Sequence, residues 1–226
     1  MPIVAASGLP LKIASEHANQ CISIRACNAL NSAEPGDDVI SRLCATEGVS
    51  DGEAAAMGMF LLFAGHETTV VTIGMGALLL LGNPAQWQAL TAAPGLIPGA
   101  VEEILRAQGM GGGGIPRYAR ADLGIGGVTV RAGEMVLLDI GTAHHDPAVF
   151  ADPDRFEVTR QAAHNLTFGH GARYCIGAAL ARIELQAAFT QLAERFPSMR
   201  LAAPVAELRL NTDVLTGGLA QLPVTW

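Results

Sequence analysis

Several kinds of residue are scarce in this chain of 226 residues, and each scarcity excludes a class of protein. Aromatic residues make up 5% of the sequence and charged residues 15%, whereas apolar residues reach 50%. Disordered chains combine low hydrophobicity with high charge, so this composition predicts a folded protein with a mainly aliphatic core. Lysine occurs only as Lys12, and the net charge of −7 argues against a partner that is a nucleic acid.

The cysteines lack the Cys-x-x-Cys spacing that is typical of structural zinc sites and redox pairs. They are Cys21, Cys27, Cys44 and Cys175. A chain of this size and apolar content does not need disulfides to fold. No positively charged segment precedes an apolar block at the N-terminus, which argues against a secretory signal. We therefore expect a cytoplasmic protein.

The longest apolar stretch, Met57–Leu81, is long enough to cross a bilayer as a helix. Ser50 and Glu53 have the spacing of a capping box, so we expect the helix to begin there. His66 and Glu67 lie near its centre, where polar groups are costly in lipid. We interpret the stretch as the buried central helix of a protein that does not enter a membrane.

The rest of the sequence predicts short helices and short strands separated by turns rich in glycine and proline. We expect helices over 38–45, 84–90, 99–106 and 178–196, and strands over 117–121, 128–130 and 135–140. The predicted fold class is mainly α with small β-sheets, in the α+β class. Residues 1–33 are a poorly defined N-terminal segment, and residues 34–226 are predicted to form a single domain.

Cys175 lies in a glycine-rich loop directly before the last predicted helix. A helix N-terminus stabilises a thiolate, and glycines such as Gly171 and Gly177 let the backbone approach a flat cofactor. A lone cysteine is also a common small buried side chain, and the spacing alone leaves both interpretations open. His144 and His145 lie in a predicted turn, and we assign no metal site to them.

The segment Ala64–Thr69 interrupts the long apolar helix with a glycine, an acid and two hydroxyls. Gly65 disfavours a helix interior by about 1 kcal/mol relative to alanine. The Thr68 hydroxyl can bond to the carbonyl four residues earlier and open the helix for a ligand or water. A fully hydrogen-bonded buried cluster is the alternative that these residues leave open.

Four motifs follow one another along the chain: A-G-x-E-T-T at 64–69, E-x-x-R at 103–106, P-x-R-F at 153–156 and F-x-x-G-x-x-x-C-x-G at 168–177. With these motifs the chain resembles a cytochrome P450 of the soluble bacterial type. The resemblance covers about residues 35 to 226 and only the later half of the family's fold. It implies an N-terminally truncated chain that keeps the long central helix and the cysteine-loop helix.

The resemblance implies a haem-thiolate site, in which Cys175 is the axial ligand of a haem b iron. Thr68 and Glu67 match the catalytic residues that manage water and protons at bound dioxygen. Glu103, Arg106 and Arg155 match a structural ion-pair triad behind the haem. The other implied cofactor-binding residues are Arg173 and Arg117 at the haem propionates, Phe168 beside the sulfur, Gly171 and Gly177 in the loop, and Ala64 and Gly65 in the helix.

The implied function is a monooxygenase that acts on a small organic substrate, in secondary metabolism, with electrons from a ferredoxin-type donor. One alternative is the same scaffold doing non-oxidative chemistry such as a cyclisation. Another is a haem-free partner that activates a second enzyme, although the intact Cys175 loop argues against it. Because Met57–Leu81 is apolar almost all round, we also expect a homodimer or a partner chain to cover it.

Overall fold

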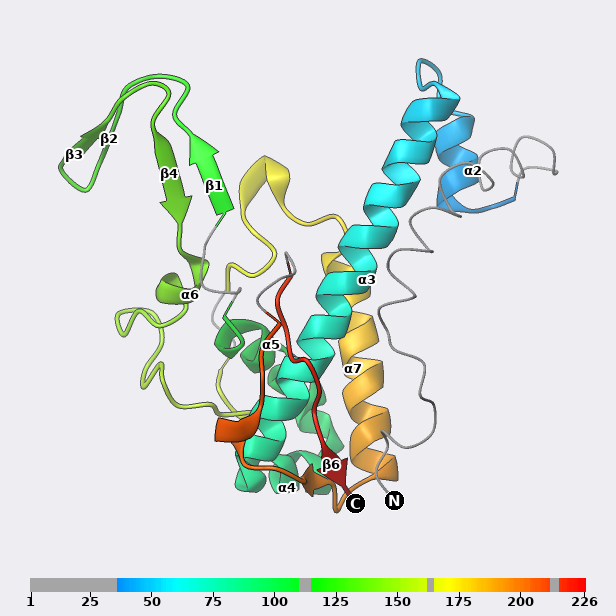
Figure 1. Ribbon diagram of the computed structural model, residues 1–226, viewed down its shortest axis with the longest axis vertical. Helices are drawn as coiled ribbons and strands as arrows, with labels where there is room; N and C mark the ends of the chain where they lie inside the picture. Colours follow the sequence, from blue (N-terminus) through cyan, green and yellow to red (C-terminus); the bar gives the residue numbers. More distant parts are fainter. Residues whose placement is uncertain (1–35, 110–114, 162–164, 212–215) are drawn as a thin grey trace. The chain divides into compact units, whose positions relative to one another are not determined.

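The computed structural model describes residues 36–109, 115–161, 165–211 and 216–226 (Figure 1). The predicted N-terminal segment, residues 1–33, lies outside them. The described chain divides after Thr68 into two compact units, and one continuous helix runs through the boundary.

The unit before Thr69 contains α2 (Val39–Cys44) and the first part of α3 (Asp51–Gly82). Asp38 caps α2, because its Oδ1 accepts the backbone N–H of Ser41 at 2.9 Å. The capping box predicted at α3 is present: the Ser50 N–H donates to Glu53 Oε2 at 2.9 Å, and the Glu53 N–H donates to Ser50 Oγ at 3.3 Å. Local side-chain chemistry therefore sets where both helices begin.

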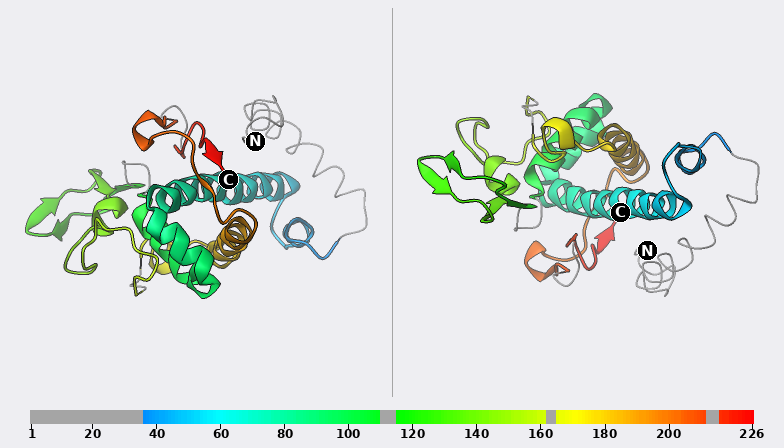
Figure 2. Two further views of the ribbon diagram at one scale, coloured as in Figure 1. Left: turned by 90° about the horizontal axis from the view of Figure 1, so that it is seen from below. Right: turned by 90° about the horizontal axis from the view of Figure 1, so that it is seen from above.

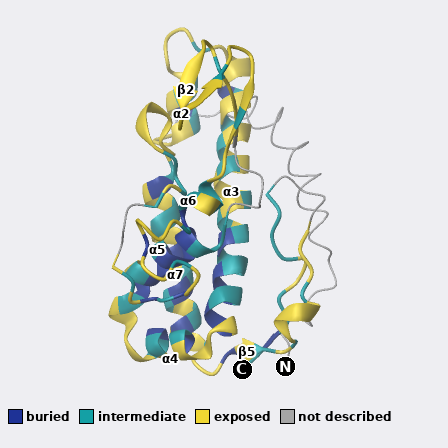
Figure 3. Ribbon diagram, turned by 90° about the vertical axis from the view of Figure 1, so that its left-hand side faces the viewer, coloured by how far each residue is buried: buried dark blue, intermediate teal, exposed yellow. Residues whose placement is uncertain are grey.

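Helix α3 has 32 residues, and its exposure changes along its length (Figure 3). By length and composition it could cross a bilayer, and only 6% of its most apolar window is buried. Met57, Phe60 and Phe63 are exposed, whereas Thr72 and Leu80 are buried. The prediction of a buried helix is therefore wrong for most of α3 in this chain, because the described core forms around its C-terminal end.

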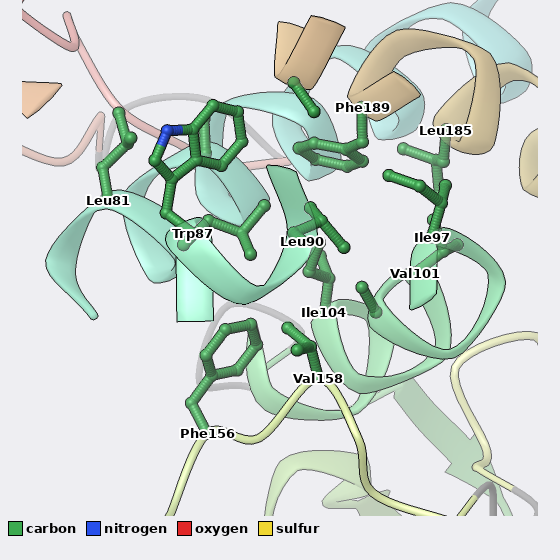
Figure 4. Packing of buried hydrophobic residues seen from close by; sticks show 14 of the residues in the cluster. Leu81, Trp87, Leu90, Ile97, Val101, Ile104, Phe156, Val158, Leu185 and Phe189 are labelled. Atoms are coloured by element: carbon green, nitrogen blue, oxygen red, sulfur yellow. The ribbon is translucent and has the colours of Figure 1, made fainter. Parts of the chain in front are cut away.

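The unit from Thr69 onwards is built on α4 (Pro84–Ala92), α5 (Ile97–Ala107), α7 (Ala178–Arg195) and the end of α3. A 3-10 turn at Pro94–Leu96 leads directly into α5. Helices α5 and α7 lie side by side (Figures 1 and 2). Their apolar faces meet those of α3 and α4, and Phe156 and Val158 complete the cluster (Figure 4). Each helix therefore owes its position to the burial of one apolar face.

The described strands form small antiparallel pairs, all in this second unit. They are β1 (Ile115–Tyr118) with β4 (Met135–Leu138), β2 (Leu123–Ile125) with β3 (Val128–Val130), and β5 (Arg200–Leu201) with β6 (Val224–Thr225). Gly126 and Gly127 have φ of 56° and 82°, the positive values that a two-residue hairpin turn requires. The predicted fold class, mainly α with small sheets, is confirmed.

Candidate functional site

The loop before α7 turns back on itself and presents Cys175 to solvent. The Cys175 N–H donates to the Phe168 carbonyl at 2.9 Å, which closes the loop at its two ends. Gly169 and Gly171 have φ of 75° and 72°, in the region that favours glycine. The Ala178 N–H then donates to the Cys175 carbonyl at 3.3 Å, where α7 begins. The predicted glycine-rich turn into a helix therefore exists at Cys175.

Cys175 presents an accessible thiol just before α7. The thiol is free and exposed, whereas Cys44, also free, is half-buried. No side chain caps the N-terminus of α7 at Gly177, two residues after Cys175. A Cβ on Gly177 would lie 3.9 Å from Cys175 Sγ, so glycine keeps the space beside the sulfur open.

Among the described residues, no three His, Cys, Asp or Glu side chains come together to hold a metal ion. An exposed free thiol in a glycine-rich loop fits the single protein ligand that a haem iron takes from such a loop.

Arg182 on α7 fastens the Cys175 loop to α5, and the sequence analysis did not single it out. Its Cζ lies 4.5 Å from the centroid of the Phe168 ring. Its guanidinium donates to Glu102 Oε1 at 2.6 Å and to the Tyr174 hydroxyl at 3.3 Å. The hydrogen bond to the Glu102 carboxylate raises the pKa of Arg182 further above its ordinary value. The sequence alone does not distinguish Arg182 from other charged residues on the polar face of a helix.

The Glu103–Arg106 pair is buried, with exposures of 3% and 2%. Arg106 donates to both carboxylate oxygens of Glu103, at 2.8 and 2.9 Å. The second guanidinium on Glu103 belongs to Arg160, whose Nε lies 3.0 Å from Oε2. The assignment of Arg155 to this triad is wrong: its side chain is largely exposed and pairs with Glu157 at 3.1 Å. Arg155 contributes its carbonyl instead, which accepts from Arg160 at 2.6 Å.

The polar segment Ala64–Thr69 is helical, and Thr68 makes the predicted side-chain hydrogen bond to the backbone. The Thr68 Oγ1–H donates to the Ala64 carbonyl at 2.6 Å, four residues earlier. Glu67 is half-buried and Gly65 is exposed. A Cβ on Gly65 would meet nothing within 4 Å. The segment therefore offers a surface of small residues with a carboxylate and a hydroxyl beside it.

The two arginines assigned to carboxylate recognition are both exposed. Arg117 lies on β1, where its Nη1 donates to the neighbouring Pro116 carbonyl at 3.1 Å. Arg173 ends the 3-10 turn Gly171–Arg173, two residues before Cys175. A guanidinium recognises carboxylates through paired hydrogen bonds, so each of these exposed arginines is accessible to an acidic group.

Comparison with known proteins places these features in one family. The sequence pattern of cytochrome P450 matches residues 95–205. Cytochrome P450 105C1 of a Streptomyces species is 47% identical over 198 residues, which are 87% of this chain and 52% of that protein. Pentalenolactone synthase of Streptomyces exfoliatus is 46% identical over 85% of this chain and 50% of its own length.

A solved structure agrees with these sequence relatives. The LnmA cytochrome P450 hydroxylase from the leinamycin biosynthetic pathway of Streptomyces atroolivaceus has a TM-score of 0.84 and 37% identity. The match covers 100% of this chain and 59% of the LnmA chain. The chain spans about half the length of the curated relatives that it matches.

Proposed function

Because this chain belongs to the cytochrome P450 family, we propose that it carries the haem-thiolate centre of a monooxygenase. The observation that supports this most directly is Cys175, an exposed free thiol that a glycine loop holds at the N-terminus of α7. The exposure of this thiol supports a role as a metal ligand rather than as a core side chain. We propose haem b as the cofactor, with residues 34–226 forming one haem-binding core.

Residues of the loop and of β1 would hold the haem. Cys175 would bind the iron, and Phe168 would pack beside the sulfur under the Arg182 guanidinium. Gly171 and Gly177 would leave room for the ring, while Arg173 and Arg117 would pair with its propionates. On α3, the small residues Ala64 and Gly65 would let the ring approach the helix. When bound, a haem with a thiolate ligand supplies the activation of dioxygen.

Thr68 and Glu67 would handle protons at this centre. The Thr68 hydroxyl is oriented by its bond to the Ala64 carbonyl, and a hydroxyl is a group that can relay a proton together with water. The half-buried Glu67 carboxylate can take a proton from solvent and pass it on. Neither side chain needs to touch the iron to perform these tasks.

The relatives indicate the kind of reaction and substrate. Their names describe a pentalenolactone synthase and a hydroxylase of leinamycin biosynthesis, so we propose a small organic substrate from secondary metabolism. We further propose a cytoplasmic enzyme with a ferredoxin-type electron donor. A second copy or a partner chain would cover the exposed apolar residues of α3, among them Met57 and Phe60.

Oxygen consumption tests this function before the substrate is known. The haem-loaded chain is mixed with a ferredoxin, its reductase and NADPH, and dioxygen uptake is followed. We expect uptake that depends on the ferredoxin and is lost in Cys175→Ala but kept in Cys44→Ala, the matched control. Ferredoxin-dependent uptake that is unchanged in Cys175→Ala, or its absence from a fully haem-loaded wild-type chain, would contradict the proposal.

A further inference from the structure

His144 is 2% exposed. Each nitrogen of its ring makes a hydrogen bond to the backbone of another segment. His144 follows the short helix α6 (Ile140–Ala143). Its Nδ1 lies 3.2 Å from the Arg106 carbonyl oxygen, and its Nε2 lies 2.7 Å from the Leu166 backbone nitrogen. A carbonyl only accepts and a backbone N–H only donates, so Nδ1 carries the proton and Nε2 accepts. The contacts therefore require one neutral tautomer.

The first of these bonds ties the ring to the buried ion pair. The Arg106 carbonyl is one of the last in α5, which the helix itself leaves without a donor. In return, Arg106 Nη1 donates to the His144 carbonyl at 2.9 Å. The Phe150 ring packs edge-on against the imidazole, with centroids 6.2 Å apart. The protein thus fixes the orientation of the ring from two sides.

The second bond ties the ring to the entrance of the Cys175 loop. The Leu166 carbonyl accepts the Gly169 N–H at 2.8 Å, at the first turn of that loop. The next residue, Thr167, donates its hydroxyl to the Leu105 carbonyl at 2.8 Å. Two successive residues at the start of the Cys175 loop are therefore attached to the end of α5. Thr167 bonds to it directly, and Leu166 bonds to it through His144.

We propose that His144 is a positioning residue for Cys175: its neutral imidazole holds the loop entrance against α5, and protonation of Nε2 releases it. A protonated ring has two donors, so its Nε2–H would face the Leu166 N–H and the hydrogen bond would be lost. The inference rests on the proposed haem-thiolate function of the loop, because only a bound iron makes the position of the sulfur consequential.

The surroundings of the ring oppose its protonation. Burial lowers the pKa of His144 below its ordinary value of 6.5, and the charges of Arg106 and His145 lower it further, against the effect of the Arg106 carbonyl. The Arg106 guanidinium is itself paired with the Glu103 carboxylate at 2.8 Å. The unfolded chain therefore takes up this proton at a higher pH than the folded chain. Stability from His144 is present above about pH 6.5 and is lost progressively as the pH falls below it.

Two substitutions separate the two hydrogen bonds. His144→Gln places an amide oxygen near the position of Nε2, so it keeps an acceptor for Leu166 but cannot be protonated. His144→Asn places an amide near Nδ1, so it keeps a donor for the Arg106 carbonyl but does not reach Leu166. His145→Gln is the control for a neighbouring imidazole, whose Nδ1 contacts the Gly141 carbonyl at 2.9 Å.

The thiolate-type Soret band of the ferrous–carbonyl protein, titrated from neutral pH down to about pH 5, reports the position of the sulfur. We expect the wild type and His145→Gln both to lose the band on acidification, with the midpoint of His145→Gln slightly higher because it lacks the charge of His145. We expect His144→Gln to keep the band to a lower pH than either. His144→Asn should show a weakened band already at neutral pH. A His144→Gln curve that coincides with the wild-type curve would overturn the inference.

Urea unfolding of the haem-free chain separates this inference from the proposed function. Below about pH 6.5 the wild-type unfolding constant should rise relative to that of His144→Gln, by up to about tenfold per pH unit. Equal pH dependence in the two proteins would refute the role of His144. A wild-type chain that shows this dependence but never forms a thiolate-type band would instead refute the haem-thiolate function.

Discussion

At the scale of single residues, two arginines five positions apart have opposite environments. Arg160 donates to the buried carboxylate of Glu103 at 3.0 Å, whereas Arg155 pairs with Glu157 at the surface. Arg160→Ala removes a charged donor from a buried acid and should lower the free energy of unfolding by about 2 kcal/mol. Arg155→Ala should cost under about 1 kcal/mol, as is usual for exposed pairs. Urea unfolding of both variants measures the difference, and equal losses would contradict the assignment of Arg160.

Thr68 is the residue whose substitution separates proton delivery from haem binding. Thr68→Ala removes a hydroxyl on α3 but leaves Cys175 untouched, so the ferrous–carbonyl spectrum should not change. With a substrate that the wild-type chain converts, the variant should divert electrons to peroxide. The measurement is product and peroxide formed per NADPH consumed, and an unchanged ratio would exclude this role for Thr68.

At the scale of elements, one glycine determines how closely α3 approaches the core. A Cβ on Gly76 would lie 2.6 Å from Phe189 Cζ and 2.8 Å from Ile104 Cγ2, so Gly76→Ala forces a shift in packed side chains. We expect it to lower the free energy of unfolding by about 1–3 kcal/mol.

Gly74 in the same helix is the matched control, because a Cβ there would meet nothing within 4 Å. Gly74→Ala should raise the free energy of unfolding by about 0.5–1 kcal/mol through helix propensity alone. Urea unfolding gives both values. Two changes of the same sign would show that α3 does not pack as described.

Helix ends and side-chain bonds could be predicted where the interacting residues are close in sequence. The caps at Asp38 and Ser50, and the bond from Thr68 to Ala64, join residues three or four positions apart, so sequence spacing reveals them. The contacts of the candidate site are not local. Those of His144, Arg160 and Arg182 join residues 22, 57 and 80 positions apart. Only the packing of α5, α7 and the loops brings such residues together. The family resemblance therefore implied Arg155 where the structure has Arg160.

At the scale of the whole molecule, the exposed apolar residues of α3 indicate that another chain buries them. Met57, Phe60 and Phe63 are 47%, 62% and 43% exposed, and soluble monomers seldom expose large contiguous apolar patches. We expect the chain at micromolar concentration to self-associate or to bind a hydrophobic dye. Sedimentation with a dye-binding assay measures both properties. A folded, monodisperse monomer that binds no dye would contradict the expected homodimer or partner chain.

The ferrous–carbonyl difference spectrum of the purified, haem-loaded chain measures thiolate ligation by Cys175. We predict a thiolate-type Soret band in the wild type and in Cys44→Ala, and its loss in Cys175→Ala. The Cys44 thiol is half-buried and serves as the control for removing a sulfur elsewhere. A wild-type spectrum without that band, or an unchanged band in Cys175→Ala, would contradict thiolate ligation by Cys175.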